Sequence, residues 1–417
     1  MRQTTYWQTF WICALGFAAL WALLLVADPS RHQLNVFFRG GDDFLADYFN
    51  HTRYAAGRDP YFNTINGLHE HIYPPLCYLL LYPQTLFVPY SSMSLAECWT
   101  SPAALLCAGL FLALSLFFYL HSLFLLCRKF EAPRYLWIVI LFSSVSLFAL
   151  ERGNFILLTA ACVNYFICFK DSGRKRWLCV LCLALASTFK VFPVLFALYY
   201  LRRREYRTFV AAGVVTALLV FVPFLFFKHG LVENLEQLLR NISAQTPIYG
   251  MSKSPDHFGV IAIFLQVEHS LGLSSSPAVY SAGKWLNYGL GLCTLFLFFK
   301  ASSPTLRLGL LSMMCALFPQ QASVYSGVYL FPLLIALASA RLSAASWTKR
   351  EKKLYGSLIL LFVLALLPLQ LGKATYYINN GGFVLMWTVL LALAFAEWRR
   401  PAATGRRPVA TASAGIG

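Results

Sequence analysis

Acidic residues gather in one short stretch of this chain, just after its first long apolar segment. Residues 40–61 read GGDDFLADYFNHTRYAAGRDPY and hold four of the seventeen carboxylates, Asp42, Asp43, Asp47 and Asp59. A carboxylate is a side chain that can take a proton in general-base chemistry. The following YFNHTRYAAG predicts a short amphipathic helix ending at Gly57. Asp42 or Asp43 could therefore cap that helix or lie in a solvated loop, although capping does not require two acids.

Two further polar groups interrupt apolar sequence and could bind an anion. The tetrapeptide ERGN occupies 151–154, and its Arg152 offers the fork of N–H donors that suits phosphate oxygens. Glu151 and Arg152 could instead neutralise each other as an anchor at the lipid headgroups. Lys190 lies in FKVFP and has the same two interpretations, since lysines in such positions often reach toward the membrane surface.

These polar residues lie between or within apolar segments that we expect to be membrane helices. The chain has 417 residues, of which 59% are apolar and 12% charged, and its mean hydropathy is +0.61. Charged residues make up about a quarter of ordinary soluble proteins, and a membrane helix needs about 20 mostly apolar residues. Such runs recur along the sequence. We expect one all-α polytopic membrane domain of about 10–12 transmembrane helices over residues 1–398, with a disordered cytoplasmic tail at 399–417.

The net charge of +17 indicates topology rather than nucleic-acid binding, so no nucleic acid is expected as a partner. The basic residues cluster in short connections between apolar runs, which is the pattern of the positive-inside rule. The segments predicted to share the cytoplasmic side are 128–134, 170–176, 202–207, 349–353 and 398–407.

The topology that satisfies this rule needs one hairpin. Residues 177–201 are predicted to form two short half-helices that turn at Lys190, and 73–87 is predicted to be a short Pro-broken segment along the membrane. The first apolar run is long enough to span, so it is read as a helix rather than a signal peptide. The predicted spans are 7–27, 101–127, 135–150, 208–227, 280–299, 304–319, 323–340, 354–371 and 382–398.

Metal and cofactor motifs are not evident. The eleven cysteines are scattered, mostly in apolar runs, which is typical of buried, inert thiols. His69 and His71 flank Glu70, but a metal would need further ligands, so no metal and no cofactor are expected. Asn50-His51-Thr52 and Asn241-Ile242-Ser243 match the short N-glycosylation pattern.

Several of these pieces together resemble glycosyltransferase family 87 of the GT-C superfamily. That family shows an Asp, a Tyr- and Ala-rich helix, a Gly, a DPY triplet and then YPPL. Here Asp43, Tyr48, Gly57, 59–61 and 73–76 fill these places. Further on, 152–154 and 190–193 stand near the places of the family's G-Q-x-N and K-x-x-P elements. RGN and FKVFP also resemble the first mannosyltransferase of glycolipid-anchor synthesis, a distant relative.

The resemblance covers roughly residues 1–345, with one departure. Where the family often has a Trp or His near a Pro, this chain reads FPQQASVYSGVYLFP, with Gln320, Gln321 and Tyr325. The resemblance implies a GT-C fold, an outer catalytic loop at 28–100 carrying short juxtamembrane helices, and a second outer loop at 228–279.

The resemblance also implies a mechanism. A hexose, with mannose expected, moves with inversion from a polyprenyl-phosphate donor to a lipid or glycan acceptor on the extracytoplasmic face of the cell membrane, among membrane lipids. Asp43 is the expected general base, with Asp42 as the second candidate, and cationic groups stabilise the leaving phosphate. The expected substrate-binding residues are Arg152, Asn154, Lys190, Tyr48, Tyr61, Tyr73, Gln321 and Tyr325.

The same composition fits a transporter or flippase for a lipid-linked or polar substrate. Such a protein should carry charged or helix-breaking residues near mid-membrane in two corresponding halves. Here the polar candidates are predicted to gather at one face, and no internal repeat is evident. A non-enzymatic scaffold is a third interpretation, but it leaves the acidic loop unexplained.

Overall fold

A computed structural model gives the fold of the chain. It describes residues 44–64, 71–133, 135–250, 257–272, 276–319, 322–339, 349–366 and 373–399. The predicted first span, 7–27, and the predicted tail lie outside the described residues. Within them the chain is almost entirely helical, which confirms the predicted all-α class.

The first half of the described chain forms a series of long and short helices. Their α-helical bounds are α3 (Ala46–Ala55), α4 (Pro75–Leu81), α5 (Leu95–Thr100), α6 (Pro102–Phe130), α7 (Leu136–Leu141), α8 (Ser144–Arg152), α9 (Ile156–Phe169), α10 (Arg176–Phe189), α11 (Leu198–Arg202) and α12 (Tyr206–Phe221). Short 3₁₀ turns join several of them, at η1 (Ala56–Arg58), η2 (Tyr82–Leu86), η3 (Tyr90–Ser92), η4 (Gly173–Lys175), η5 (Phe192–Ala197) and η6 (Val222–Phe226).

The second half adds seven helices and one short β-pair. The helices are α13 (Gly230–Gly250), α14 (Val260–Ser270), α15 (Pro277–Lys300), α16 (Pro304–Leu317), α17 (Phe331–Leu337), α18 (Lys349–Leu366) and α19 (Lys373–Trp398), with η7 (Val324–Leu330) before α17. The strands β1 (His257–Phe258) and β2 (Ala322–Ser323) pair antiparallel and bring α14 to the start of η7.

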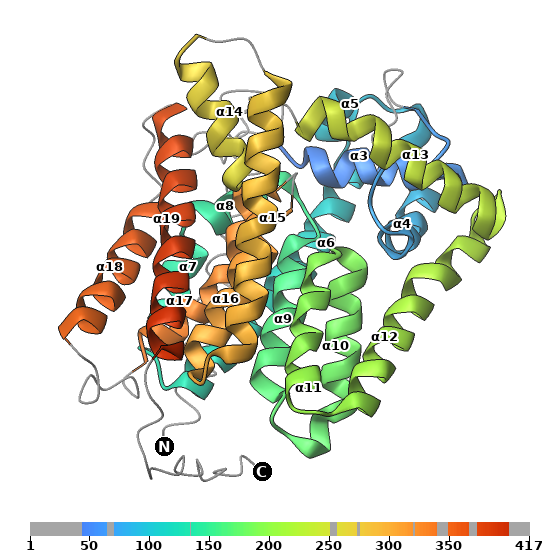
Figure 1. Cartoon of the computed structure of the whole chain (residues 1–417). Coiled ribbons are helices and arrows are strands. Elements are labelled where there is room, and N and C mark those ends of the chain that lie inside the picture. Colours follow the sequence, from blue (N-terminus) through green and yellow to red (C-terminus); the bar gives the residue numbers. More distant parts are fainter. Residues whose placement is uncertain are drawn as a thin grey trace.

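The long helices form a bundle whose members run roughly along one direction (Figure 1). Three stretches of the described chain are long and apolar enough to cross a membrane: Pro102–Phe130, Tyr206–Phe226 and Asn380–Trp398. Shorter apolar helices such as α9 and α16 lie buried among them. The structure is that of an all-α polytopic membrane protein, and the count of about 10–12 spans stays a prediction.

The predicted hairpin at 177–201 is present. Helix α10 ends at Phe189, where Lys190 adopts an extended backbone (φ −145°), and Pro193 then opens η5. The chain returns through α11 to the end at which α10 began. There Arg203 donates to the Lys170 carbonyl at 3.1 Å and pairs with Asp171. Lys190 therefore lies at the tip of the hairpin, away from its two ends.

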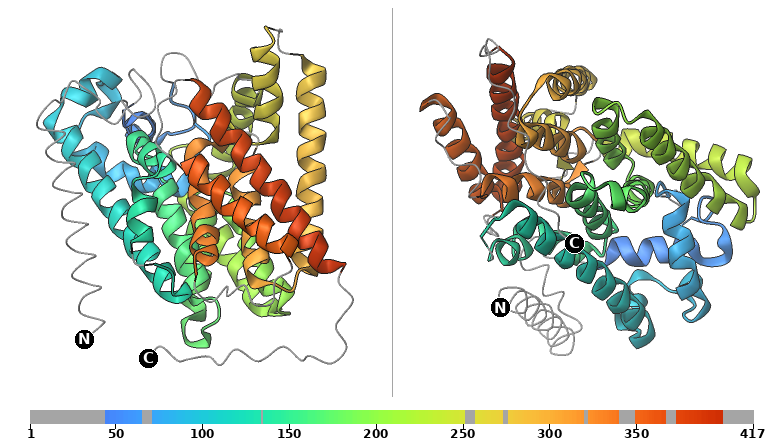
Figure 2. Two further views of the ribbon diagram at one scale, coloured as in Figure 1. Left: turned by 90° about the vertical axis from the view of Figure 1, so that its left-hand side faces the viewer. Right: turned by 90° about the horizontal axis from the view of Figure 1, so that it is seen from below.

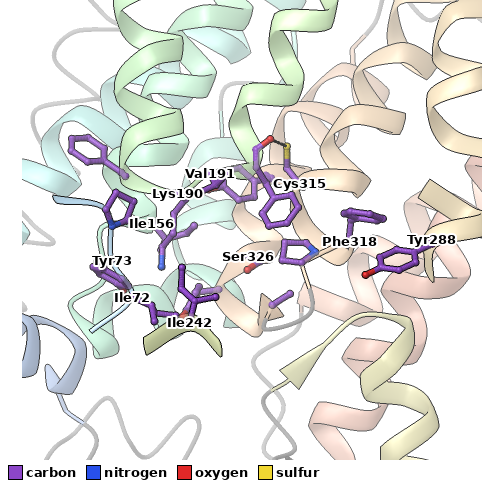
Figure 3. Close-up of a pocket in the computed structure, with 17 residues that line it drawn as sticks. Ile72, Tyr73, Ile156, Lys190, Val191, Ile242, Tyr288, Cys315, Phe318 and Ser326 are labelled. Carbon is purple, nitrogen blue, oxygen red and sulfur yellow. Dashed lines mark hydrogen bonds between the residues drawn. The ribbon is translucent and has the colours of Figure 1, made fainter. Parts of the chain in front are cut away.

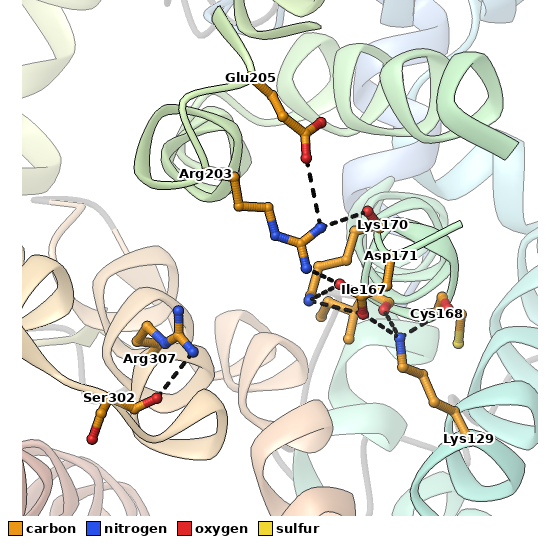
Figure 4. A network of polar contacts seen from close by, with 9 residues as sticks. All are labelled: Lys129, Ile167, Cys168, Lys170, Asp171, Arg203, Glu205, Ser302 and Arg307. Atoms are coloured by element: carbon orange, nitrogen blue, oxygen red, sulfur yellow. Dashed lines mark hydrogen bonds and ion pairs between the residues drawn. The ribbon is translucent and has the colours of Figure 1, made fainter. Parts of the chain in front are cut away.

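The predicted basic connections meet at this end of the bundle (Figure 4). Lys129, in the last turn of α6, donates to the carbonyls of Ile167 and Cys168 at 2.7 and 2.9 Å and pairs with Asp171 at 3.1 Å. These cations hold the pKa of Asp171 below its ordinary value even though burial alone would raise it. Three basic segments that are far apart in sequence thus share one side, as the charge pattern predicted.

Short helices form a layer at the opposite end of the bundle. Helices α3, α4 and α5 lie there, and α13 crosses beside them (Figures 1 and 2). The predicted outer loop at 228–279 is therefore largely helical, since it contains α13 and α14. Leu231, Leu235 and Leu238 recur at helical spacing and pack onto the core, which explains why α13 forms.

One predicted span is broken. The span at 135–150 divides into α7 and α8 because Ser143 takes an extended conformation and caps α8, accepting a hydrogen bond from the Ser146 amide. The span at 323–340 is a continuous helix over Val324–Leu337, in which η7 runs directly into α17. Conversely, α19 begins at Lys373, so KATYYINN, predicted to lie outside the last span, continues that helix.

Candidate active site

The site is built where α3 meets the turn between α8 and α9. The backbone N–H of Leu45 donates to the carbonyl of Glu151 at 2.6 Å, which fixes the start of α3 against ERGN. Gly153 ends α8 with φ +63°, a conformation that favours glycine. A Cβ at Gly153 would lie 2.8 Å from the Tyr48 Cβ. Glycine is thus required both by its backbone angle and by the close approach of α3.

This contact brings Asp47 onto two of the predicted site residues. Arg152 donates through Nε to Asp47 Oδ1 at 3.0 Å and through Nη2 to the same oxygen. Asn154 Nδ2 donates to the other oxygen, Oδ2, at 2.6 Å. Burial alone would raise the pKa of this carboxyl, but Arg152, together with His51 and Asn154, lowers it below its ordinary value. Asp47 is therefore an ionised acceptor with both oxygens engaged.

Asn154 also joins this cluster to Tyr73, the first residue of YPPL. The same Nδ2 donates to the Tyr73 hydroxyl at 2.6 Å. The ring of His51, one helical turn after Asp47, stacks on the Tyr73 ring with centroids 3.6 Å apart. Burial lowers the pKa of His51 to about 3 and raises the pKa of Tyr73 well above its ordinary value. Both rings are consequently neutral at physiological pH.

A cavity of about 440 Å³ opens beside Tyr73 and holds Lys190 (Figure 3). Lys190 Nζ lies 4.2 Å from the centre of the Tyr73 ring and 5.6 Å from that of Tyr325. Most of the wall is apolar or aromatic, and residues from distant parts of the sequence contribute to it, among them Ile72, Ile156, Phe192, Ile242, Tyr288 and Phe318. Within the described parts of the chain, no carboxylate pairs with Lys190 and no acceptor is hydrogen-bonded to its Nζ. The cavity thus combines one cation with a largely apolar wall.

The cavity lies at the end of the bundle opposite the basic network. Helix α9 has fourteen residues, which corresponds to about 21 Å at 1.5 Å per residue. It runs from just after Asn154 at the site to just before Lys170 at the basic end, and α10 returns antiparallel to it and ends at Phe189, next to Lys190. Four of the predicted substrate-binding residues are brought together in this way: Arg152 and Asn154 in the Asp47 cluster, and Tyr73 and Lys190 at the cavity. Tyr325 lines the cavity as well.

Two other predicted binding residues pack into the protein instead. Tyr48 is 2% exposed, lies against Phe49 and Phe111, and its hydroxyl contacts Gln84. Tyr61 is fully buried and donates to the Tyr73 carbonyl at 2.8 Å. Neither lines the cavity, so their contacts with a ligand stay predictions. Asp42, Asp43 and Gln321 lie outside the described residues, and their roles stay predictions too.

Sequence reasoning did not assign Asp47 and His51 to the site. The signal that could have found them is their i, i+4 spacing in the predicted helix, which places both on one face. Their importance depends on which face meets ERGN and YPPL, and the spacing alone does not give that. Among the described residues, no group of three or more His, Cys, Asp or Glu side chains is arranged to hold a metal ion.

His71 and Asn241 stabilise the layer of short helices. The sequence had suggested a metal ligand for the first and a glycosylation site for the second. His71 is buried against Tyr54, with ring centroids 3.5 Å apart. Asn241 is 2% exposed, and its amide donates to the carbonyls of Tyr61 and His71 at 3.1 and 3.3 Å. Asn241 therefore fastens α13 to the segments on either side of residues 65–70.

Comparison with known proteins decides the family. Residues 71–319 match the family model for Glycosyltransferase family 87. The chain belongs to glycosyltransferase family 87. The match includes YPPL, ERGN and Lys190, whereas the acidic stretch at 40–61 precedes it. Searches of curated proteins and of solved structures find no match.

Family membership confirms the predicted enzyme class. The protein is a membrane glycosyltransferase, and its reaction requires a sugar donor and an acceptor. Thirteen of the seventeen residues that line the cavity at Lys190 lie within the matched region, and residues of both KVFP and YPPL are among them. It is the candidate site for one of these two substrates.

Proposed function

We propose that the protein transfers a hexose, with mannose expected, from a polyprenyl-phosphate carrier to a lipid or glycan acceptor on the extracytoplasmic face of the cell membrane. One observation carries this proposal most directly: Lys190 stands in a largely apolar cavity with no carboxylate partner in the described chain. Lys190 is partly buried, and a cation that is withdrawn from water without a counter-ion is costly. The donor's phosphate would supply the missing anion, and its prenyl chain suits the apolar wall.

The position of the cavity supports the extracytoplasmic assignment. The clustered cations of 128–134, 170–176 and 202–207 lie at the other end of the bundle, and the positive-inside rule assigns such an end to the cytoplasm. The Lys190 end would then face outside. A donor carried by a membrane lipid reaches this face without a nucleotide, because its sugar is already activated.

The chemical step needs a base and stabilisation of the leaving phosphate. We assign the base to Asp43, with Asp42 as the second candidate, because both oxygens of Asp47 are occupied by Arg152 and Asn154. Asp43 takes the proton of the acceptor hydroxyl while that oxygen attacks the anomeric carbon from the face opposite the phosphate. The bond from the sugar to the phosphate oxygen breaks, the configuration inverts, and the lipid phosphate leaves with the bonding electrons.

Lys190 stabilises the charge that develops on the leaving phosphate. Arg152 is the second candidate for this role. Its guanidinium also pairs with Asp47, through Nε and Nη2. Arg152→Lys should not restore what Arg152→Ala removes, because the ammonium group lacks the fork.

The experiment incubates the purified protein in lipid nanodiscs with a membrane lipid extract as acceptor. Radiolabelled polyprenyl-phosphate mannose, polyprenyl-phosphate glucose and GDP-mannose are offered separately. Label should pass to lipid or glycan from a polyprenyl-phosphate sugar and not from the nucleotide sugar. Transfer from GDP-mannose alone would contradict the proposed donor.

A matched pair of lysine variants tests the cavity. Lys190→Ala should abolish transfer, whereas Lys175→Ala should leave it unchanged. Lys175 is a suitable control because its Nζ also lies over an aromatic ring, 4.1 Å from the centre of Phe169, but at the basic end of the bundle. Equal activity of the two variants would show that Lys190 does not serve the reaction.

A further inference from the structure

Asp47 is linked to Lys190 through two intermediate side chains, although 143 positions of sequence separate them. We propose that Asp47 is a positioning residue for Lys190: through Asn154 it fixes the Tyr73 ring on which the Lys190 ammonium rests, so that the cation faces the donor's phosphate. This inference rests on the proposed function, in which Lys190 contacts that phosphate.

The first link is the orientation of the Asn154 amide. Its carbonyl oxygen accepts a hydrogen bond from the backbone N–H of Ile156 at 2.9 Å, at the start of α9. The NH₂ group must therefore face the other way, toward Asp47 and Tyr73. An ionised carboxylate only accepts hydrogen bonds, so the two N–H donors of Asn154 are matched to the Asp47 and Tyr73 oxygens, both 2.6 Å away.

The second link is the placement of the Tyr73 ring. Its hydroxyl is held by Asn154, and its two faces are in contact with His51 and Lys190, at 3.6 and 4.2 Å from the ring centre. Two groups that both approach the centre of one ring to contact distance must occupy opposite faces. Tyr73 is thus clamped at its polar end and on one face, and its other face is left for the cation.

The arrangement also explains why Asp47 does not neutralise Lys190. Arg152 is hydrogen-bonded to Oδ1 and Asn154 to Oδ2, and neither oxygen is hydrogen-bonded to the lysine. Lysine is a flexible side chain with a compact charge, and an aromatic face attracts such a cation without removing its charge. The cluster therefore holds the ammonium in place while leaving it able to bind an anion.

The experiment measures binding of undecaprenyl phosphate, a sugar-free probe, to the full chain in nanodiscs. Asp47→Asn and Tyr73→Phe should each weaken binding about tenfold, as expected when one hydrogen bond of this kind is lost. The double variant should also be weakened about tenfold, not about a hundredfold, because both changes break one chain of contacts. If Asp47→Asn does not fold, Asn154→Ala and Tyr73→Phe, singly and combined, provide an equivalent double-mutant cycle.

Asp171→Asn controls for lost stability, since it breaks an ion-pair network at the basic end and should leave binding unchanged. Additive losses, or wild-type binding by Asp47→Asn, would overturn the positioning role. Lys190→Ala separates this inference from the proposed function. The proposed lipid-phosphate site is wrong if Lys190→Ala binds the probe like wild type, or if inorganic phosphate competes with the lipid at equal concentration. If Lys190→Ala loses binding but Asp47→Asn and Tyr73→Phe do not, only the positioning role of Asp47 is wrong.

Discussion

Replacing Gly153 by alanine tests the contact on which the whole site depends. Gly153 lies in the turn between α8 and α9 with φ +63°, and its α-carbon faces helix α3. A methyl group there would lie 2.8 Å from the Tyr48 Cβ and 3.0 Å from the Leu45 Cδ2. Real Cβ atoms do not approach other carbons so closely, so either α3 or the turn must shift.

The size of the effect follows from these two terms. A left-handed conformation costs about 1–2 kcal/mol for a residue with a Cβ. Forcing a methyl group into a packed contact costs about 1–3 kcal/mol more. We therefore expect Gly153→Ala to lower the free energy of unfolding by about 2–5 kcal/mol. Because Asp47 lies on α3 and Arg152 and Asn154 flank Gly153 in the turn, either shift should lengthen the pairs between them, and glycosyl transfer should fall even in the folded fraction.

The assay is thermal unfolding of the purified protein together with transfer activity well below the melting temperature. Gly109→Ala in α6 is the control, since nothing lies within 4 Å of its added Cβ, and alanine is favoured over glycine inside a helix. Gly109→Ala should leave the protein as stable or slightly more stable. If Gly153→Ala also melts like wild type, the close approach of α3 to this turn is not as described.

Three further predictions address the base, the buried histidine and the topology. Asp43→Asn should reduce transfer about 10²-fold or more at unchanged stability, and Asp42→Asn should reduce it less; the reverse order in a matched activity assay would exchange their roles. The pKa of His51 falls from its ordinary 6.5 to about 3 in the folded protein, so between these pH values the unfolded chain binds a proton that the folded chain excludes. The melting temperature should therefore fall as the pH is lowered through this window, and His51→Gln should flatten that dependence, whereas an unchanged slope would show that His51 is not buried as a neutral ring. On a cysteine-free background, Gly173→Cys should be protected from a membrane-impermeant thiol reagent added outside, and labelling there would refute the proposed orientation.

The hairpin at 177–201 shows how far a charge pattern can determine a fold. Placing 170–176 and 202–207 on one side of the membrane required the chain to turn back between them, and Lys190 and Pro193 indicated the position of that turn. This inference needed only the local sequence, because the cost of moving cations across a membrane depends on residue type and not on distant contacts. The break at Ser143 was less evident, since a capping residue permits a break without requiring one.

The residue types at the site, and the helices and loops that carry them, follow from local sequence. Apolar runs, basic connections and the YPPL and ERGN motifs are local properties, and each can be recognised in a window of a few residues. They were sufficient for the all-α membrane class, the helix ending near Gly57 and the candidacy of Tyr73, Arg152, Asn154 and Lys190.

Which of these side chains meet depends on the packing of the folded chain. Asp47 is one of four acids in its stretch. It becomes the partner of Arg152 and Asn154 because Gly153, which has no side chain, lets α3 pack closely against the turn between α8 and α9. Tyr48 and Tyr61 stand in the same motif as Asp43, yet packing turns both into the core. A helix presents residues in every direction, and the face that is buried depends on contacts with segments about a hundred positions away. Those contacts follow from the packing of the whole chain, so no short window of sequence contains them.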